Sequence, residues 1–454
     1  MQKTWREKLM LACATLLVLA CGMVFVRFGT AQVLVKRLHQ NNAVVQWIFQ
    51  DDKEMLQGSK SKELRPDEIP VDWAGLYPFA ADIEQATAQK ENVPFFLKLQ
   101  RTIHQAERRV DTWTNGHFWQ YLRWVQLANS YQKGIHWDIS VLGGYNSVVV
   151  LPDGQLVRFM ERKDMKPKIA VIRSFAEQCH ERDINFLFVL APGKISPHDT
   201  AYAGRIDFSN EVADAFLAGL QEAQVDYLDL RTDMPPDGDA QRALFFRTDH
   251  HWLPGTAREA TVHLSEYLNK HYGYRGDTSL LATEHYKEED YPQSWLGSLG
   301  KKITLARAQP EGFTLYYPDF STSFQLEIPS MALKKEGDFS SLYDMAVFDE
   351  SNIYERSLYG AYAYGDRALE QIRNHELQDD KRLLMVRDSF GDAVVPFLAL
   401  QTPRLDTIDL RHFNGSLQNY IDQTHPDTVV VLYSIEELNN DVEYKSHKNL
   451  FDFR

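Results

Sequence analysis

The sequence predicts an α/β protein with a mostly parallel sheet and helices on both faces of that sheet. From about residue 139 onward, short apolar runs of strand length alternate with amphipathic stretches of helix length, which is the pattern of βαβ units. The runs at 185–190 and 428–433 are almost continuously apolar, as is typical of parallel strands buried on both faces. Further strands are expected at 147–151, 225–230, 382–386 and 407–410, and helices at 168–182, 211–223, 256–272, 392–400 and 417–425.

The composition is that of a folded protein with a large core. The chain has 454 residues, of which 44% are hydrophobic and 25% charged. Its formal net charge of -14 argues against nucleic acid as a partner, because nucleic-acid binding selects for basic surfaces. Only Cys179 lies outside the N-terminal apolar segment, so the body of the protein has neither an internal disulfide nor a thiolate metal site. We expect Cys179 to be a small buried apolar residue.

The N-terminus predicts a membrane anchor. Lys3, Arg6 and Lys8 precede an 18-residue apolar segment at 9–26. At about 1.5 Å per residue, this segment spans about 27 Å, which matches the hydrocarbon core of a bilayer. The apolar run continues past Cys21, and this favours an uncleaved signal anchor over a lipoprotein cleaved and acylated at that cysteine. The body of the protein is then expected outside the cytoplasmic membrane.

The chain is expected to have three parts. Residues 1–30 form the anchor, residues 31–138 a helical and aromatic-rich juxtamembrane segment, and residues 139–454 the α/β domain. Aromatic residues are dense at 113–137, where they are expected to pack on the main domain; the alternatives are a surface on which sugars stack and a helix that lies against the membrane. Residues from about 286 to 373 break the strand–helix rhythm and are expected to be an irregular insertion.

An Asp-x-His pattern gives the first candidate for chemistry. Asp249 and His251 follow an apolar run at 243–246, expected to be a strand end, and precede a helix that begins near Pro254. Loops at the carboxyl ends of strands are where open α/β sheets bind their ligands. An aspartate two residues before a histidine can orient the imidazole, so that its other nitrogen acts as a base. The alternatives are a metal site made by Asp249, His250 and His251, or a structural role.

An Asp-Ser pair gives the second candidate. Ser389 stands between the strand expected at 382–386 and the helix expected at 392–400, where its backbone N–H can face a developing oxyanion. A serine hydroxyl needs a neighbouring base before it becomes a good nucleophile, and the Asp-x-His pattern supplies one. The alternative is that Asp388 and Ser389 only cap the helix.

These motifs, in this order, resemble a known family. Asp-His-His-Trp followed by a helix looks like the signature of the DHHW proteins, which group with the alginate O-acetyltransferases among the SGNH hydrolase-like proteins. The histidine block precedes the serine block, which is the permuted order of that group. The resemblance covers about residues 147 to 433. The blocks that carry it are Thr-Asp-His-His-Trp (248–252), Asp-Ser-Phe (388–390) with Val-Pro-Phe-Leu (395–398), Ala-Pro-Gly-Lys (191–194), Trp-Leu-Gly-Ser-Leu-Gly (295–300), Asp-Leu-Arg-His-Phe (409–413) and Val-Leu-Tyr (431–433).

The resemblance implies an SGNH-hydrolase-like, flavodoxin-like fold and a catalytic triad. Ser389 would be the nucleophile, His251 the base and Asp249 the residue that orients it, with no metal or organic cofactor. Arg387 departs from the family pattern, because a small or polar residue often precedes Asp-Ser; it is expected either to bind an anionic group or to pair with a surface carboxylate. Candidate substrate-binding residues are His250, Trp252, Lys194, Arg387 and Arg411.

The implied function is extracytoplasmic O-acyl transfer, with acetyl as the expected group, to hydroxyls of a cell-envelope or secreted polysaccharide. The reaction would pass through an acyl-serine intermediate, and a polytopic membrane-bound O-acyltransferase would be the partner. Two alternatives stay open at this point. One is an esterase that removes acyl groups from a polysaccharide, and the other is a non-catalytic glycan-binding or assembly factor.

Overall fold

The computed structural model describes residues 148–454 except 152, 199–200, 203–204 and 440–449. The predicted anchor, the predicted helical segment at 31–138 and its aromatic stretch lie outside the described residues. Within the described ranges, no helix has both the length and the apolar character needed to span a bilayer.

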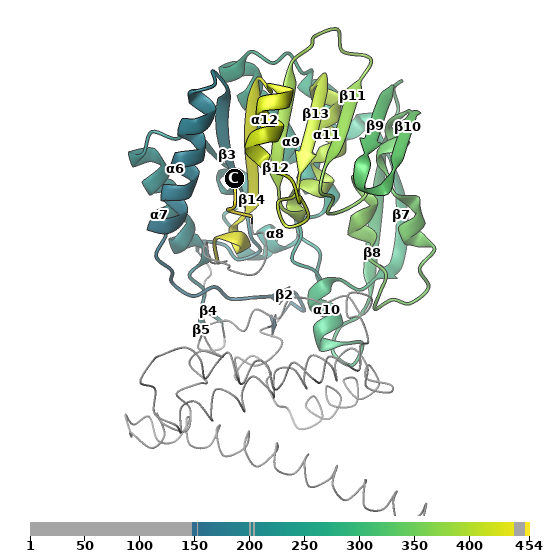
Figure 1. Ribbon diagram of the computed structural model, residues 1–454. Helices are drawn as coiled ribbons and strands as arrows, with labels where there is room; N and C mark the ends of the chain where they lie inside the picture. The colour runs from purple at the N-terminus through teal and green to yellow at the C-terminus, as the bar shows by residue number, and fades with distance from the viewer. Residues whose placement is uncertain (1–147, 152, 199–200, 203–204, 440–449) are drawn as a thin grey trace, which may run out of the picture. The chain divides into compact units, whose positions relative to one another are not determined.

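The core of the structure is an eight-stranded sheet with the order β10-β9-β11-β13-β12-β14-β3-β6 (Figure 1). The five strands from β13 to β6 pair in parallel, whereas β11, β9 and β10 continue the sheet in antiparallel pairs. The predicted, mostly parallel sheet is therefore confirmed. The strands are β3 (Asn185–Ala191), β6 (Tyr227–Asp229), β9 (Phe324–Ile328), β10 (Leu333–Gly337), β11 (Glu370–Asn374), β12 (Arg382–Arg387), β13 (Arg404–Ile408) and β14 (Thr428–Ser434).

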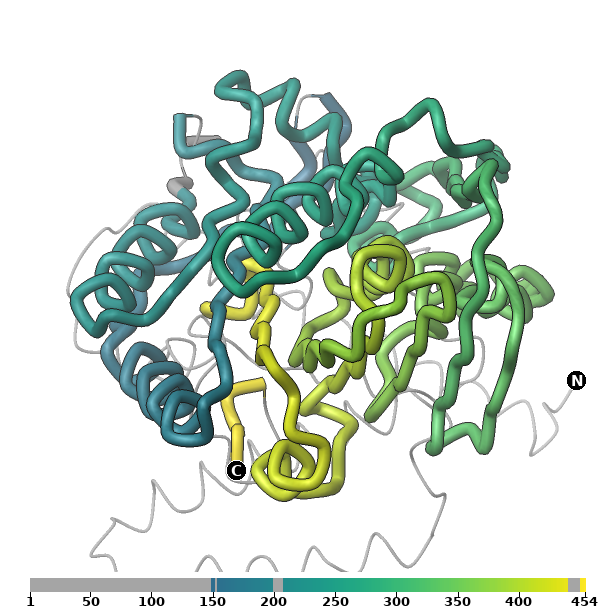
Figure 2. Tube along the Cα trace, turned by 90° about the horizontal axis from the view of Figure 1, so that it is seen from above, coloured from purple at the N-terminus to yellow at the C-terminus, as the bar shows by residue number. Residues whose placement is uncertain are grey.

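Helices cover both faces of the sheet, and the apolar strands explain why. Successive residues of β3 point to opposite faces: Leu187 and Val189 join a core that contains α9 and α11, while Phe186 and Phe188 join a core that contains α6, α7 and α12. Figure 2 looks down on this layered arrangement. The helices are α6 (Lys166–His180), α7 (Ser209–Glu222), α8 (Gly238–Arg242), α9 (Pro254–Tyr272), α10 (Ser298–Ile303), α11 (Val395–Gln401) and α12 (Leu417–Thr424).

The region 286–373 is more regular than the sequence predicted. It holds β7 (Tyr286–Trp295) and β8 (Glu311–Pro318), which form a separate antiparallel hairpin, and also β9, β10 and β11 of the main sheet. A search for continuous apolar runs misses β9, because β9 buries every second residue and presents polar side chains between them. Such alternation is typical of strands that are covered on one face.

Short elements complete the domain. Two-stranded pairs are formed by β1 (Val149–Val150) with β2 (Leu156–Val157), and by β4 (Ala201–Tyr202) with β5 (Arg205–Ile206). The helix expected at 392–400 is in fact a 3₁₀ turn followed by α11. Further 3₁₀ turns are η4 (Leu230–Asp233), η5 (Thr278–Leu281), η6 (Thr283–His285), η7 (Pro329–Met331), η8 (Phe339–Leu342), η9 (Met345–Phe348), η10 (Leu358–Ala361), η11 (Ser389–Ala393) and η12 (Ile435–Asn439).

Cys179 lies inside α6 and is buried among apolar side chains. Burial raises the pKa of its thiol to about 12, so the thiol stays protonated and unreactive at physiological pH. The prediction of a small buried apolar residue is confirmed.

Candidate active site

Ser389 begins the 3₁₀ turn η11, and one residue, Asp388, separates it from the end of β12. The capping residue is Asp388, whose Oδ1 accepts the Phe390 N–H at 3.0 Å and whose Oδ2 accepts the Ser434 N–H at 2.7 Å. Asp388 thus accepts a free N–H at the start of the turn and also links the turn to the end of β14 by a hydrogen bond. Because the cap is made by Asp388, the Ser389 hydroxyl is left for another partner: it lies 2.7 Å from Nε2 of His251.

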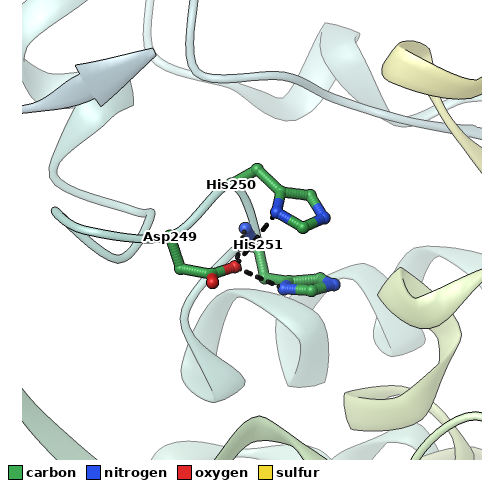
Figure 3. A group of neighbouring side chains, drawn as sticks. All are labelled: Asp249, His250 and His251. Atoms are coloured by element: carbon green, nitrogen blue, oxygen red, sulfur yellow. Dashed lines mark hydrogen bonds and ion pairs between the residues drawn. The ribbon is translucent and has the colours of Figure 1, made fainter. Parts of the chain in front are cut away.

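Asp249 and His251 form a compact pair within one loop (Figure 3). Oδ1 of Asp249 accepts the backbone N–H of His251 at 3.1 Å and lies 2.5 Å from Nδ1 of its ring. Both side chains are almost fully buried. Asp249, His251 and Ser389 therefore make one continuous line of hydrogen bonds, although Ser389 is 138 residues away from His251 in the sequence.

The loop does not follow a strand, contrary to the prediction for 243–246. These residues follow α8, and only Phe245 forms an isolated bridge, with Trp252. The loop is closed instead by two backbone hydrogen bonds, from Phe246 N–H to His251 O and from Leu253 N–H to Leu244 O. The apolar run has a different cause: Phe246 packs edge-on against Trp295 inside an aromatic core.

The glycine-rich block at 295–300 holds Asp249 from the other side. The Ser298 N–H donates to Oδ2 of Asp249 at 2.5 Å, and the Gly297 N–H donates to the hydroxyl of Thr248 at 2.8 Å. Glycine is required at 297, because a Cβ there would lie 2.4 Å from Cβ of Asp249. Each Asp249 oxygen thus has its own donor, and the carboxylate is fixed in direction.

The charges around the pair set its protonation. Burial alone would raise the pKa of Asp249, but His250, His251 and the Ser298 N–H hold it well below its ordinary value. Burial and repulsion from His251 hold the pKa of His250 well below its ordinary value. Asp249 is therefore ionised and His250 neutral near pH 7. An ionised Asp249 assigns the proton on His251 to Nδ1, which leaves Nε2 as the acceptor that faces Ser389.

Two aromatic neighbours flank His251. The ring of His250 lies with its centroid 3.9 Å from that of His251, and its Nδ1 is 3.0 Å from the Ser298 hydroxyl. On the other side, the ring of Tyr359 stacks on His251 at 4.0 Å, and its hydroxyl accepts the Trp252 indole N–H at 3.0 Å. The sequence pattern did not indicate Tyr359, because it lies in the region expected to be irregular. His250 is partly exposed and remains a candidate contact for substrate.

Trp252 and Lys194 are structural, which corrects the expectation that they contact substrate. Trp252 is completely buried, and its indole N–H also lies 3.2 Å from the Phe390 carbonyl. The buried Nζ of Lys194 donates to the carbonyls of Leu156 at 2.8 Å and Arg247 at 3.4 Å. Burial lowers the pKa of Lys194 to about 8. Both side chains use their N–H groups for hydrogen bonds within the protein, next to the Asp-His loop and the turn of Ser389.

Arg387 is likewise buried, so it neither binds an exposed anion nor pairs with a surface carboxylate. Its guanidinium donates to Glu370 at 2.9 Å and to Asp392, both of which are buried too. Because Asp392 lies in η11, this network fastens the turn of Ser389 to β11 and β12. Arg411, in contrast, is about one-third exposed and bridges Asp409 at 2.7 Å and Asp366 at 2.9 Å. It follows β13, at the sheet edge that also carries Ser389.

Two groups of carboxylates and imidazoles in the described part of the chain have atoms close enough to share a cation. In the first, Asp249, His250 and His251, the ring nitrogens of His251 already face Asp249 and Ser389. In the second, Asp366, Asp409 and His412, the guanidinium of Arg411 lies between the carboxylates. Both arrangements use their potential ligand atoms for hydrogen bonds and ion pairs within the protein.

The comparison with protein families supports an SGNH hydrolase-like fold. Residues 153–332 match the family model described as the SGNH hydrolase-like domain of the acetyltransferase AlgX, and this confirms the resemblance to the alginate O-acetyltransferase group. The match covers the Asp-His loop and the glycine-rich block and ends before Ser389. It supports an enzyme of the acyltransferase or esterase type.

Several solved structures match this chain, and PatB1 shows a similar fold. Bacillus cereus PatB1 is 20% identical, with a TM-score of 0.53, over 68% of this chain and 100% of that chain. PatB1 with a sulfonyl adduct gives the same values. A DHHW family protein from Eubacterium siraeum is 15% identical, with a TM-score of 0.49, over 66% of this chain and 94% of that chain. No relative was found among the curated proteins.

Proposed function

We propose that this protein transfers acetyl groups to hydroxyls of a cell-envelope or secreted polysaccharide through an acyl-Ser389 intermediate. The observation that carries the proposal is the hydrogen-bonded line Asp249–His251–Ser389, with distances of 2.5 and 2.7 Å. It lies in a domain whose matched family model is that of an acetyltransferase. A serine next to an oriented imidazole is the arrangement that acyl transfer requires.

Each residue has a defined part in the reaction. Nε2 of His251 takes the proton of Ser389 as Oγ attacks the carbonyl carbon of the acyl donor, and it then gives the proton to the leaving group. Asp249 stabilises the imidazolium that forms in between. The first N–H groups of a helical turn lack partners within that turn, so the N–H of Ser389 can donate to the oxyanion. In the second half, His251 takes the proton of the sugar hydroxyl as the hydroxyl oxygen attacks the acyl-serine, and it then gives that proton to Oγ of Ser389 as the ester bond to Ser389 breaks.

The acyl donor and the location complete the proposal. The body lies outside the cytoplasmic membrane, tethered by residues 9–26, and a polytopic membrane-bound O-acyltransferase delivers the acyl group. The basis for the location is the apolar segment behind a short basic head, and the basis for the partner is the resemblance to the alginate O-acetyltransferase group. An esterase would share the first half of the chemistry and differ only in the acceptor, which would be water.

Competition between a polysaccharide and water for the acyl-serine distinguishes a transferase from an esterase. The full-length protein is given p-nitrophenyl acetate with and without a soluble polysaccharide. A transferase should release p-nitrophenol faster as the polysaccharide concentration rises, and O-acetyl groups should appear on the polymer, because a sugar hydroxyl competes with water for the acyl-serine. Unchanged release with all acetyl recovered as acetate identifies an esterase. A protein that binds the polymer without any turnover would be a glycan-binding factor.

Reporter fusions test the location. A reporter that is active only outside the membrane, fused after residue 60, should be active, and one that is active only in the cytoplasm should be silent. Mass spectrometry of the N-terminus should find residues 1–20 retained. Acylation of Cys21 would replace the anchor by a lipid, whereas a cytoplasmic body would exclude an envelope polysaccharide as substrate.

A further inference from the structure

The loop that carries Asp249 and His251 is closed by its own backbone hydrogen bonds, and groups outside the loop hold it as well. One of these groups is the carboxylate of Glu311, at the start of β8. Its Oε2 accepts the Arg247 N–H at 2.6 Å, and its Oε1 accepts the Thr248 N–H at 2.6 Å and also the Thr248 hydroxyl. A single carboxylate therefore holds two successive backbone amides directly before Asp249.

The Thr248 hydroxyl links Glu311 to the second support of the loop. It donates to Glu311 and accepts the N–H of Gly297, and the next N–H along the chain, from Ser298, reaches Asp249. Glu311 and these two N–H groups lie close together because Glu311 on β8 pairs with Trp295, the last residue of β7. One end of the hairpin thus presents both the carboxylate and the two amides.

We propose that Glu311 is a positioning residue for acyl transfer, acting through Thr248 and Asp249 on His251. The inference rests on the proposed function. The hydrogen bonds of Glu311 go to Arg247 and Thr248, and none goes to His251 or Ser389. Glu311 therefore affects the chemistry by fixing the direction of the Asp249 carboxylate. Groups behind the reacting residues commonly set their geometry in this way.

A matched control exists elsewhere in the domain. Asp207 is a buried carboxylate that accepts the backbone N–H groups of Met160 at 2.8 Å and Ser209 at 2.9 Å, and also the Ser209 hydroxyl. Glu311 has the same kinds of partner, namely two backbone N–H groups and one hydroxyl. The Asp207 carboxylate, however, supports the start of α7. Removing either charge should cost comparable stability, and only the loss at Glu311 should disturb the Asp249–His251 pair.

The test uses full-length wild type, Glu311→Gln, Glu311→Asp and Asp207→Asn. The measurements are kcat and KM for p-nitrophenyl acetate, the rate of inactivation by phenylmethylsulfonyl fluoride, and the melting temperature. We expect Glu311→Gln to lower kcat about 10- to 100-fold and to leave KM within about twofold, since a displacement of about 1 Å is that costly to a reacting group. Inactivation, which reports the activation of Ser389, should slow in parallel. Glu311→Asp, which keeps the charge but shortens the reach, should be intermediate.

Asp207→Asn should keep kcat within about threefold, even where its melting temperature falls as far as that of Glu311→Gln. The proposal is overturned if Glu311→Gln keeps full kcat, or if both variants lose activity in proportion to stability. Full activity of Glu311→Asp would mean that only the charge matters, which also overturns it. If Glu311→Gln does not fold, Thr248→Ala breaks the same link and should show the same loss of kcat. Activity retained by Ser389→Ala would instead refute the proposed function.

Discussion

Replacing Ser389 by alanine should abolish acyl transfer and leave the fold almost unchanged. The hydroxyl is the only group lost, and its hydrogen bond to Nε2 of His251 is worth about 1 kcal/mol of stability. Catalysis should fall by at least about 10⁴-fold, because no acyl-enzyme can form without the nucleophile. Turnover of p-nitrophenyl acetate and thermal melting, measured on the same preparations, check both parts.

Ser341→Ala is the matched control for this experiment. Ser341 is buried, and its hydroxyl has no hydrogen-bond partner among the described residues, so its removal should change neither activity nor melting. Retained activity in Ser389→Ala would place the nucleophile elsewhere. A large drop in its melting temperature would show that Ser389 mainly stabilises the turn, although the cap is made by Asp388.

Replacing Arg387 by methionine should destabilise the fold far more than the loss of the Ser389 hydroxyl. Arg387 is completely buried between Glu370 and Asp392, and its loss leaves two buried carboxyl groups without this cation. Breaking a buried ion pair on one side costs about 3–5 kcal/mol of unfolding free energy. Urea unfolding monitored by fluorescence should show this loss, and activity should fall with it because Asp392 lies in the turn of Ser389.

The loss of unfolding free energy in Arg387→Met should depend on pH, and the pKa shifts of its partners give the direction of that dependence. Burial raises the pKa of Glu370 and Asp392, and Arg387 counteracts the rise in both. A carboxyl whose pKa is higher in the folded than in the unfolded state favours folding below the unfolded pKa, and this advantage is lost as the pH rises through the folded pKa. Without Arg387 the two pKa values rise further. The instability of Arg387→Met should therefore be greatest at neutral pH and smaller in mild acid.

Arg404→Met provides the control on the same sheet. Arg404 forms an exposed ion pair with Asp380 at 2.8 Å, and such a pair contributes less than about 1 kcal/mol. If the two arginine variants unfold at similar urea concentrations at neutral pH, the buried network contributes little. A deficit of Arg387→Met that grows in acid would contradict the assigned direction of the pKa shifts.

The sequence by itself determined the parallel core and the local form of both motifs. Runs such as 185–190 are apolar at nearly every position, and only a strand covered on both faces needs that pattern. The Asp249–His251 contact joins residues two apart, so a single turn of the loop is enough to make it. The place of Ser389 between a strand and a helical turn could also be predicted from the local sequence. The spacing of the apolar residues changes there from that of a strand to that of a helix.

The tertiary structure alone decided which groups meet across the domain. Ser389 reaches His251 because the packed domain brings two segments 138 residues apart to one place, and no local pattern encodes that contact. The sequence predicts that Arg387 binds an anionic group or pairs with a surface carboxylate, but its partners are buried carboxylates from β11 and from η11. Glu311 holds the Asp-His loop from a strand that the hydropathy pattern did not show. Periodicity in a sequence reports which face of an element is buried, whereas the partners on that face depend on how distant elements pack.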